Sequence, residues 1–491
     1  MKQDSPTPAE NRRWLLILAV LVFAEVNSSF EVGMMYGALA TLMREFGDPV
    51  GVGWLITAFL LVGAVSAGLS SRLGDLYGRR RLLILTLAFA LAGSLIGAFA
   101  TSLPWLIAGR AVQGMSAALL PLTIGLVREH LPKARVPVGI GWVAAMASFT
   151  AGAGILLGGW LVDHAGWRWI FWFSVGQTAL SIVAVATLLP PSVRQAAVGR
   201  LDLLGGVLFA PGVALLLWAV TRMKGSGPAD PVTLGLIATG LLAIAAWVRH
   251  EWRHPQPMID VRRFAERQVG LAMGLMALFG LGTAQLMLVI LLLAQQPAWT
   301  GIGLGLTATL AATIKVPASI AGLFGAPWSG HVAARHGARR AALVGSVVIC
   351  AGWVGVLLHH DAVWLLVAEA FLITLGGSIL YAAIPNLIVE VAPTDRTSEI
   401  NGMSHVVRTV GTAIGTQLAT LLLASSTVSD AARGAGTHPS PAAYALTFAF
   451  VIACAGAGVL LAIALPRRSS AGAPLQVPSQ VAGRSESTGN Y

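Results

Sequence analysis

Long apolar stretches recur along almost the whole chain, each of them roughly 18 to 28 residues, and they constrain the fold more than any other feature. A helix of about 20 residues spans the apolar core of a bilayer, which is about 30 Å thick. Only 11% of the residues are charged and 56% are hydrophobic, whereas a soluble domain has about 25% charged residues. The chain is therefore predicted to be an all-α polytopic membrane protein, and an ordinary soluble enzyme is excluded.

Charges, prolines and Gly/Asn clusters divide the chain into about fourteen predicted transmembrane helices. These spans cover residues 13–42, 50–71, 81–101, 104–127, 136–162, 168–189, 202–221, 231–249, 268–294, 301–332, 339–358, 362–389, 399–426 and 442–465. Segment 470–491 is rich in Ser, Gly, Gln and Pro, a composition typical of a disordered tail.

The distribution of Lys and Arg predicts the orientation, because cytoplasmic loops retain positive charge. Basic residues gather in alternate connections, such as 79–81, 128–135 and 262–267, and are sparse in the connections between them. This pattern places both termini in the cytoplasm and the chain in the inner (plasma) membrane as a multi-pass protein. The net charge of +11 is then expected to face anionic membrane lipid, and nucleic acid is not expected as a partner.

An internal repeat predicts two related halves. A single shift of the sequence superimposes Trp105 on Trp364 and Gly78 on Gly337. Two six-helix bundles follow from this repeat, and the excess length holds two extra linker helices. The predicted divisions are a cytoplasmic N-terminus at 1–12, an N-terminal bundle at 13–189, a linker with two transmembrane helices at 190–267, a C-terminal bundle at 268–465 and a disordered cytoplasmic tail at 466–491.

One connection, at residues 71–81, carries Asp75, Gly78, Arg79 and Arg80. It resembles the signature loop of the major facilitator superfamily, Gly-x-x-x-Asp-Arg/Lys-x-Gly-Arg-Arg/Lys, although the first Gly and the first base are replaced here. An acid at a helix end can pair with arginines or cap a neighbouring helix, and Gly78 permits a tight turn. The loop is predicted to be a conformational latch. The alternative is that it only fixes the topology, a role that requires the arginines but not Asp75. The copy in the second half has Ala334 in place of the acid.

The fourth predicted span contains Arg110, Gln113 and Gly114. They resemble the Arg-x-x-Gln-Gly motif of proton-coupled drug exporters in that superfamily, in which the arginine is associated with proton transfer. An arginine inside a bilayer is costly unless it is paired or hydrated. Arg110 is therefore a candidate for proton coupling, and a structural ion pair is the alternative.

The fifth span contains Gly154, Gly158 and Gly159, similar to the exporter motif Gly-Pro-x-x-Gly-Gly except that Ile155 replaces the proline. Small residues allow helices to approach closely, so these glycines are predicted to be a helix-packing motif. The following segment 167–172, Trp-Arg-Trp-Ile-Phe-Trp, resembles the fourteen-span drug:proton antiporter branch. The resemblance covers roughly residues 10 to 465.

Acids inside spans are the candidates for energy coupling, because a carboxyl group that titrates when water reaches it can carry a proton. The candidates are Glu25 and Glu31 in the first span and Glu369 in the twelfth. The branch usually has an Asp in the first span, so which Glu takes that role stays open, with Glu31 favoured. In the repeat, Glu369 falls on the position of Arg110, which would place opposite charges on related helices.

Further polar, aromatic and Met residues could line a substrate cavity, since such side chains adapt to varied ligands. The alternative is that they pack helices or face lipid. The candidates are Asn27, Met34, Tyr36, Trp54, Gln113, Lys315, Tyr381, His405 and Arg408.

These features together predict a secondary active transporter that works by alternating access, most simply proton-coupled efflux of hydrophobic or amphipathic drugs. The alternative is a proton-coupled transporter of one specific metabolite, such as a sugar, lipid or organic acid. The sequence shows no phosphate-binding loop, metal cluster or nucleophile with a base, so an enzyme is not expected. No metal and no cofactor other than the proton gradient is predicted; the partners are a small-molecule substrate, protons and membrane lipid, and the protein is expected to be a monomer.

Overall fold

The computed structural model describes residues 8–132, 135–192, 203–226, 229–254, 261–389, 397–429 and 437–466, and these residues are almost entirely helical. One short hairpin pairs strand β1 (Thr427–Val428) with strand β2 (His438–Pro439) in antiparallel register. The α-helices are α1 (Pro8–Phe46), α2 (Pro49–Tyr77), α3 (Arg79–Phe99), α4 (Leu103–Gln113), α5 (Leu119–His130), α6 (Val136–His164), α7 (Arg168–Leu188), α8 (Leu203–Ser226), α9 (Pro231–Arg253), α10 (Arg267–Leu281), α11 (Leu286–Gln295), α12 (Ala308–Thr313), α13 (Lys315–His336), α14 (Ala338–Leu358), α15 (Val363–Val389), α16 (Thr397–Leu423) and α17 (Pro441–Ala464). The 3₁₀ helices are η1 (Gly114–Ala118), η3 (Val261–Ala265), η4 (Thr283–Gln285) and η5 (Ala298–Thr300).

Twelve helical stretches in the described part of the chain are long and apolar enough to cross a membrane. Three of them are composite, because short irregular turns join α4 to α5, α10 to α11 and α12 to α13. Helices α6 and α8 have 29 and 24 residues but are not among the twelve. The all-α membrane fold is thus confirmed, and the count of about fourteen transmembrane helices stays a prediction.

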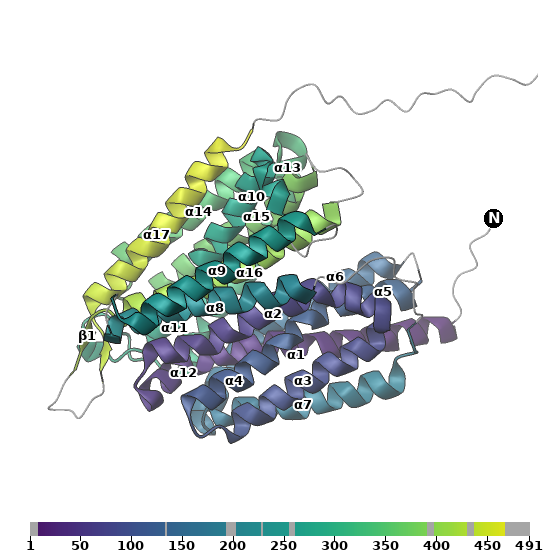
Figure 1. Ribbon diagram of the computed structural model, residues 1–491, viewed down its shortest axis with the longest axis horizontal. Coiled ribbons are helices and arrows are strands. Elements are labelled where there is room, and N and C mark those ends of the chain that lie inside the picture. Colours follow the sequence, from purple (N-terminus) through teal and green to yellow (C-terminus); the bar gives the residue numbers. More distant parts are fainter. Residues whose placement is uncertain are drawn as a thin grey trace, which may run out of the picture.

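The helices form two bundles (Figure 1). In the first bundle, α1 packs against α6 and α7, and α3 packs against α4 and α7. In the second, α15 packs against α13 and α14, and α10 packs against α16 and α17. The extra helices α8 and α9 pack on each other, and α8 also contacts α2 and α16. The exact division of the chain stays a prediction, since residues 193–202 and 255–260 lie outside the described residues.

The helix connections fall at two ends of the molecule. One end, here called the Asp48 end, holds the connections at 47–48, 100–102, 165–167 and 296–307 together with the hairpin. The opposite end, the Gly78 end, holds the turns at Gly78 and Gly337, where φ is +92° and +85°. A positive φ is strained for residues with a side chain, so glycine permits this turn in both halves. The equivalence of the two turns is what the repeat in the sequence predicts.

The two bundles meet at the Asp48 end and diverge towards the Gly78 end (Figure 1). The α2–α16 seam shows the contact, because a Cβ added at Gly53 would lie 2.7 Å from the hydroxyl oxygen of Thr420. Further along the same seam, the hydroxyl of Thr57 donates to the carbonyl oxygen of Ala413 at 3.3 Å. The molecule is therefore closed at the Asp48 end.

Candidate functional site

Arg110 lies on α4 with only 1% of its surface exposed, and it binds two neighbouring helices. Its Nε donates to the carbonyl oxygen of Leu55 on α2 at 3.0 Å, and Nη1 donates to the carbonyl oxygen of Glu31 on α1 at 3.3 Å. Nη1 also donates to Oε1 of Gln113 at 2.9 Å. The guanidinium lies over the ring of Phe59, 4.4 Å from its centroid, which adds cation–π attraction. These contacts offset part of the cost of burying the charge.

Gln113 extends this network to α3. It lies one helical turn after Arg110, on the same face of α4. Its Nε2 donates to the hydroxyl oxygen of Ser94 on α3 at 2.7 Å. At the next residue, Gly114, an added Cβ would lie 2.5 Å from the carbonyl oxygen of Phe59, so the glycine lets α4 approach α2. Each of the three motif positions predicted from the sequence thus has a physical role in one network.

Glu31 is 3% exposed and faces the interrupted part of the α4–α5 span. The hydroxyl of Ser116, in η1, donates to Oε2 of Glu31 at 2.7 Å. Its Oε1 has no hydrogen-bond partner among the described residues, nor does Nη2 of Arg110. The ion pairs within 4.0 Å in this part of the chain do not include Glu31 with Arg110. A buried carboxyl and a buried guanidinium thus lie in one network without neutralising each other directly.

Glu25 and Asn27 precede Glu31 on α1 and are also buried. Glu25 Oε2 has no partner among the described side chains. Asn27 donates to the hydroxyl oxygen of Ser181 and accepts from the hydroxyl of Thr178, both at 2.9 Å and both on α7. The structure therefore places Asn27 in the α1–α7 interface, away from the α4 side chains that contact Glu31.

Glu369 does not lie where the repeat predicted. Its carboxyl is half-buried against α14, and a Cβ added at Gly355 of that helix would lie 2.2 Å from its Oε1. It therefore lies in the contact between α14 and α15 of the second bundle.

The packing of small residues explains this difference. In the first bundle, a Cβ added at Gly93 would lie 2.6 Å from the carbonyl oxygen of Gly109. In the second bundle, a Cβ added at Gly352 would lie 3.4 Å from the carbonyl oxygen of Glu369. Glu369 thus corresponds to Gly109, and the counterpart of the arginine is the next residue, the fully buried Ala370. The sequence shift was wrong by one residue in this helix, which turns a side chain by about 100°.

A second polar cluster lies in the C-terminal bundle. Nη2 of Arg408 on α16 lies 3.2 Å from Nε2 of His405, and its guanidinium lies 5.5 Å from the ring centroid of Tyr381 on α15. Nε of Arg408 is buried without a partner among the described residues. Tyr36 on α1 is 8% exposed and packs in the buried core of the molecule.

Sequence reasoning missed the buried Gln285 of η4. Its Nε2 donates to the carbonyl oxygens of Gly280 and Thr412 at 3.0 and 3.1 Å, and its Oε1 accepts from the hydroxyl of Thr416 at 3.0 Å. The available signal was the four-residue spacing of Thr412 and Thr416, which puts both on one face of α16. This network joins α16 to the break between α10 and α11.

The remaining cavity candidates are spread over the structure. Lys315 is the half-buried first residue of α13, and Trp54 is half-buried on α2. Met34 is 1% exposed and belongs to the packed core, where its backbone lies against Gly158. Of these three, Met34 therefore has a packing role.

The three glycines of α6 pack in two directions. Gly154 and Gly158 face α1, and a Cβ at Gly158 would lie 2.5 Å from the carbonyl oxygen of Met34. Gly159 faces α12 of the other bundle, where an added Cβ would lie 2.7 Å from the carbonyl oxygen of Ala308. The motif therefore lets α6 approach both its own bundle and the opposite one.

The signature loop binds within the first bundle. Arg79 Nη1 donates to the carbonyl oxygen of Gly125 on α5 at 3.0 Å, and its guanidinium lies 3.9 Å from the carboxylate of Glu129. Arg80 Nε donates to a carbonyl oxygen of α7 at 3.2 Å. The side chain of Asp75 lies outside the described residues, so its latch role stays a prediction.

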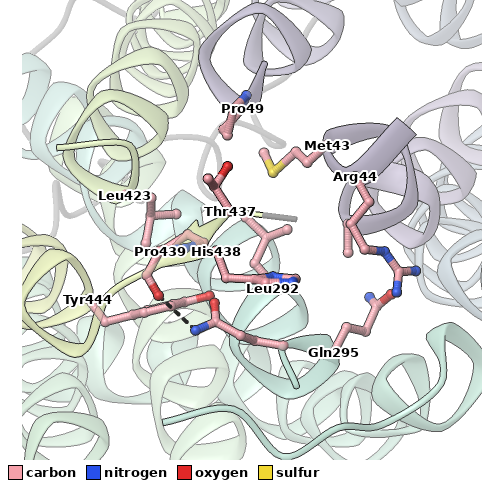
Figure 2. A pocket seen from close by; sticks show the side chains of 12 residues that line it. Met43, Arg44, Pro49, Leu292, Gln295, Leu423, Thr437, His438, Pro439 and Tyr444 are labelled. Atoms are coloured by element: carbon pink, nitrogen blue, oxygen red, sulfur yellow. Dashed lines mark hydrogen bonds between the residues drawn. The ribbon is translucent and has the colours of Figure 1, made fainter. Parts of the chain in front are cut away.

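A cavity of about 50 Å³ lies between the bundles at the Asp48 end (Figure 2). Arg44 and Gln295 point towards one another across it, and Tyr444 forms part of its wall (Figure 2). Gln296 donates to the carbonyl oxygen of Pro439 at 2.8 Å, which holds the hairpin against α11. The cavity is too small for a drug-sized ligand, which needs about 300 Å³ or more, and it belongs to the closed seam.

Comparison with solved structures identifies the fold. The chain is similar to a peptide transporter POT in complex with sulfate, with a TM-score of 0.65 at 14% identity over 94% of this chain and 97% of that one. It is similar to the xylose transporter XylE from E. coli, with a TM-score of 0.59 at 11% identity over 93% of this chain and 99% of that one. Both likenesses show the two-bundle transporter fold.

Sequence relatives agree with the fold. The chain is 30% identical over 454 residues to the "Multidrug resistance protein B homolog" of Mycobacterium tuberculosis, covering 86% of this chain and 81% of that protein. It is 28% identical over 444 residues to the "Tetracenomycin C resistance and export protein" of Streptomyces glaucescens, covering 85% of this chain and 78% of that protein. The sequence model of the Major Facilitator Superfamily matches residues 21–416. The chain therefore belongs to the Major Facilitator Superfamily and is a membrane transporter, not an enzyme.

Proposed function

We propose that this transporter exports apolar and amphipathic drug-like compounds in exchange for protons. The observation that carries the proposal is the pair of unpartnered polar atoms in the buried network, Oε1 of Glu31 and Nη2 of Arg110. Groups left without partners at this depth are costly, and such groups in membrane proteins mark ion and substrate paths. The names of the two relatives described above, which denote drug resistance and export, support the choice of cargo.

In this mechanism, Glu31 holds either a proton or the ligand. Arg110 attracts the carboxylate of Glu31 when that group is ionised, and protonation removes the attraction. Ser116 donates to one carboxylate oxygen and leaves the other free to meet water or a ligand. Each change of occupancy alters which arrangement of the two bundles is favoured, as alternating access requires.

The direction of transport follows from the distribution of basic residues between the two ends of the molecule. We place the Gly78 end in the cytoplasm, with both termini there and the protein in the plasma membrane, because the arginines of the loops at 79–81 and 335–340 lie at that end. The molecule is closed at the Asp48 end, so it represents the arrangement that loads its ligand from the cytoplasmic side. The proton gradient supplies the energy, and one copy of the chain contains both bundles that this cycle needs.

Proteoliposomes test the proposal. Purified protein is reconstituted with a pH dye inside, and ethidium uptake is measured under an imposed pH gradient. The wild type is expected to move protons against ethidium, and Glu31→Gln is expected to abolish this exchange without changing the thermal unfolding temperature. Glu45→Gln is the matched control, since that acid lies on the same helix but is exposed at the Asp48 end, outside the network. Equal exchange by wild type and Glu31→Gln removes Glu31 from the mechanism.

The other candidate cargo is a single specific metabolite. The observation that favours it is α6, which runs as one regular helix from Val136 to His164 with Ile155 at the place where the exporter motif has a proline. A panel of cationic dyes and sugars in the same vesicles distinguishes drug export from transport of one metabolite. Export of one sugar or acid and of no dye would favour the metabolite.

A further inference from the structure

A second cavity, of about 250 Å³, lies beside the Glu31 network, between α2, α3, η1 and α8. It occupies the half of α2 nearer to the Gly78 end. Nearly all of its wall is apolar; the lining includes Val62, Leu69, Leu82, Met115, Ala118 and Ala210. None of these residues belongs to the cluster around Arg110 or to the seam between the bundles.

Three hydroxyl side chains line this wall, Ser66, Ser70 and Thr86, and those of the two serines donate to the protein. Ser66 Oγ donates to the carbonyl oxygen of Met115 at 2.9 Å, and Ser70 Oγ donates to the carbonyl oxygen of Ala67 at 2.8 Å. Apart from Thr86, the surface that remains for an occupant is therefore apolar. A surface with a single hydroxyl offers too few hydrogen bonds to hold a sugar, an amino acid or a phosphate, and it fits the apolar part of a ligand.

One 3₁₀ turn separates this cavity from the coupling carboxyl. Ser116 of η1 donates to Glu31 on one side. Its neighbours Met115 and Ala118 face the cavity on the other side. A 3₁₀ stretch inside a helix has poorer hydrogen-bond geometry and often marks a hinge. An occupant that displaces Met115 therefore acts directly on the turn that positions the hydrogen bond to Glu31.

The outer wall of the cavity comes from the linker helix α8. Ala210, which lines the cavity, precedes Pro211 inside that helix. A proline in a helix removes one backbone hydrogen bond and bends the helix. On this side, the cavity is thus bounded by a small side chain at the point where the proline interrupts the backbone hydrogen bonds of α8. Helix α8 itself packs mainly on the other linker helix, α9.

We propose that this cavity is a lateral docking site for the apolar ring system of the exported compound, which reaches it from the membrane leaflet at the Gly78 end. The proposal rests on the proposed export function and assigns α8 as the side wall of the path. A volume of about 250 Å³ is below the range of about 300 to 1,000 Å³ that holds a whole drug-sized ligand, so the charged part of the compound stays outside it. Because η1 borders the cavity and also donates the hydrogen bond to Glu31, an occupant of the cavity can influence the coupling carboxyl. This link favours a transported compound over a structural lipid chain as the occupant.

Filling the cavity gives the first test. Ala210→Trp is expected to raise the KM for tetraphenylphosphonium export about tenfold, which corresponds to about 1.4 kcal/mol, and to leave kcat nearly unchanged. Leu242→Trp is the matched control, because Leu242 lies on the neighbouring linker helix with 70% of its surface exposed. An unchanged KM in Ala210→Trp, with active wild type, overturns the docking site and leaves the export function standing. No transport by the wild type contradicts the export function itself.

A labelling test does not depend on the folding of that variant. Thr86→Cys places a thiol in the cavity, and Leu85→Cys places one on the exposed side of the same helix, where Leu85 is 52% exposed. Both are made in a background with Cys350→Ala and Cys454→Ala and are alkylated with N-(1-pyrenyl)maleimide in vesicles. Tetraphenylphosphonium is expected to slow the reaction at Thr86→Cys severalfold and not at Leu85→Cys. Equal slowing at both sites, no slowing, or equal protection by added phosphatidylglycerol overturns the proposal.

Discussion

Asp163 on α6 caps α12 of the opposite bundle through Thr309. One carboxylate oxygen accepts from the backbone N–H and the hydroxyl of Thr309 at 2.8 and 2.6 Å, and the other accepts from the N–H of Ala308 at 3.2 Å. The first N–H groups of a helix have no partner within the helix, and a carboxylate there also meets the positive end of the helix dipole. The contact therefore fastens the two bundles together at the Asp48 end.

Loss of this cap is expected to open the Asp48 end. A side-chain cap contributes about 0.5 to 2 kcal/mol, so Asp163→Ala shifts the balance between the two arrangements by up to roughly thirtyfold. Spin labels at Thr101 and Asp361, which are exposed at this end on different bundles, report the shift as a population with a longer distance.

The partner residue Thr309 tests the same contact, because its hydroxyl donates to Asp163. Thr309→Val is therefore expected to lengthen the distance between the spin labels. Thr313→Val is the control and is expected to leave the distance unchanged, because the hydroxyl of Thr313 donates to the carbonyl oxygen of Leu310 within α12. The same distance distribution in Asp163→Ala and wild type would show that other contacts hold the bundles together.

Two adjacent glycines of α6 are expected to differ in their effects. Gly158→Ala forces a methyl group against the backbone of Met34 within one bundle, so the protein is destabilised by about 1 to 3 kcal/mol. Gly159→Ala forces a methyl group against Ala308 of the other bundle, so the closed Asp48 end opens while each bundle keeps its stability. Thermal unfolding and the spin-label distance measure the two effects.

The control for these glycines is Gly176→Ala on α7, where an added Cβ meets nothing within 4 Å. That change is expected to be neutral or to stabilise the helix by about 0.5 to 1 kcal/mol. If Gly158→Ala and Gly159→Ala lower the unfolding temperature equally and leave the distances unchanged, the separate roles are wrong.

The sequence predicted the fold and the core of the candidate site because both rest on strong local signals. Apolar length predicts membrane helices, and Arg110 with Gln113 lies one turn apart on one helix face, a relation that does not depend on tertiary structure. The structure adds the partners of these residues on α1, α2 and α3. The proton-coupling roles themselves stay predictions.

The placements of Glu369 and Asn27 depend on tertiary contacts that the sequence alone does not show. An alignment of the two halves by residue identity can be wrong by one residue within a helix, and a shift of one residue places a side chain on another face of that helix. Asn27 shares a helix with Glu31, but its direction depends on hydroxyls of α7 that are far away in the sequence. The cap by Asp163 was missed for the same reason, since its partner at Thr309 lies in the other half.

Acid is expected to loosen the connection between the linker helices. The hydrogen bond from Arg222, together with that from the N–H of Thr233, lowers the pKa of Asp230 below its ordinary value of 3.8. The contact is therefore complete above that ordinary value and is lost as the pH falls through the lowered one. Hydrogen exchange at the amide of Thr233 is expected to keep the same protection between pH 5 and 8 and to lose it in Asp230→Ala. A loss of protection near pH 6 in the wild type would contradict this assignment.

Gln417 is expected to connect the linker to the closed seam. Its Nε2 donates to the hydroxyl oxygen of Thr221 on α8 at 3.0 Å, and its Oε1 lies 3.5 Å from the hydroxyl of Thr57 on α2. Gln417→Leu keeps the volume and removes both contacts, so α8 is expected to separate from α16. The rate of amide hydrogen exchange along α8 is then expected to be higher in Gln417→Leu than in the wild type. An unchanged rate would show that α8 is held by apolar packing alone.

The last prediction concerns the support of Arg110. Gln113→Leu removes the acceptor of Arg110 Nη1 and the donor to Ser94, and the loss of such buried partners costs about 1 to 3 kcal/mol. Gln177→Leu on α7 is the control, because Gln177 is 9% exposed and its Nε2 has no partner among the described residues. Thermal unfolding is expected to show a lower midpoint for Gln113→Leu and an equal or higher one for Gln177→Leu. Since Arg110 then has fewer contacts to fix it beside Glu31, proton-coupled flux is also expected to fall only in Gln113→Leu. Equal stability and flux in both variants would mean that α1 and α2 alone hold the guanidinium in place.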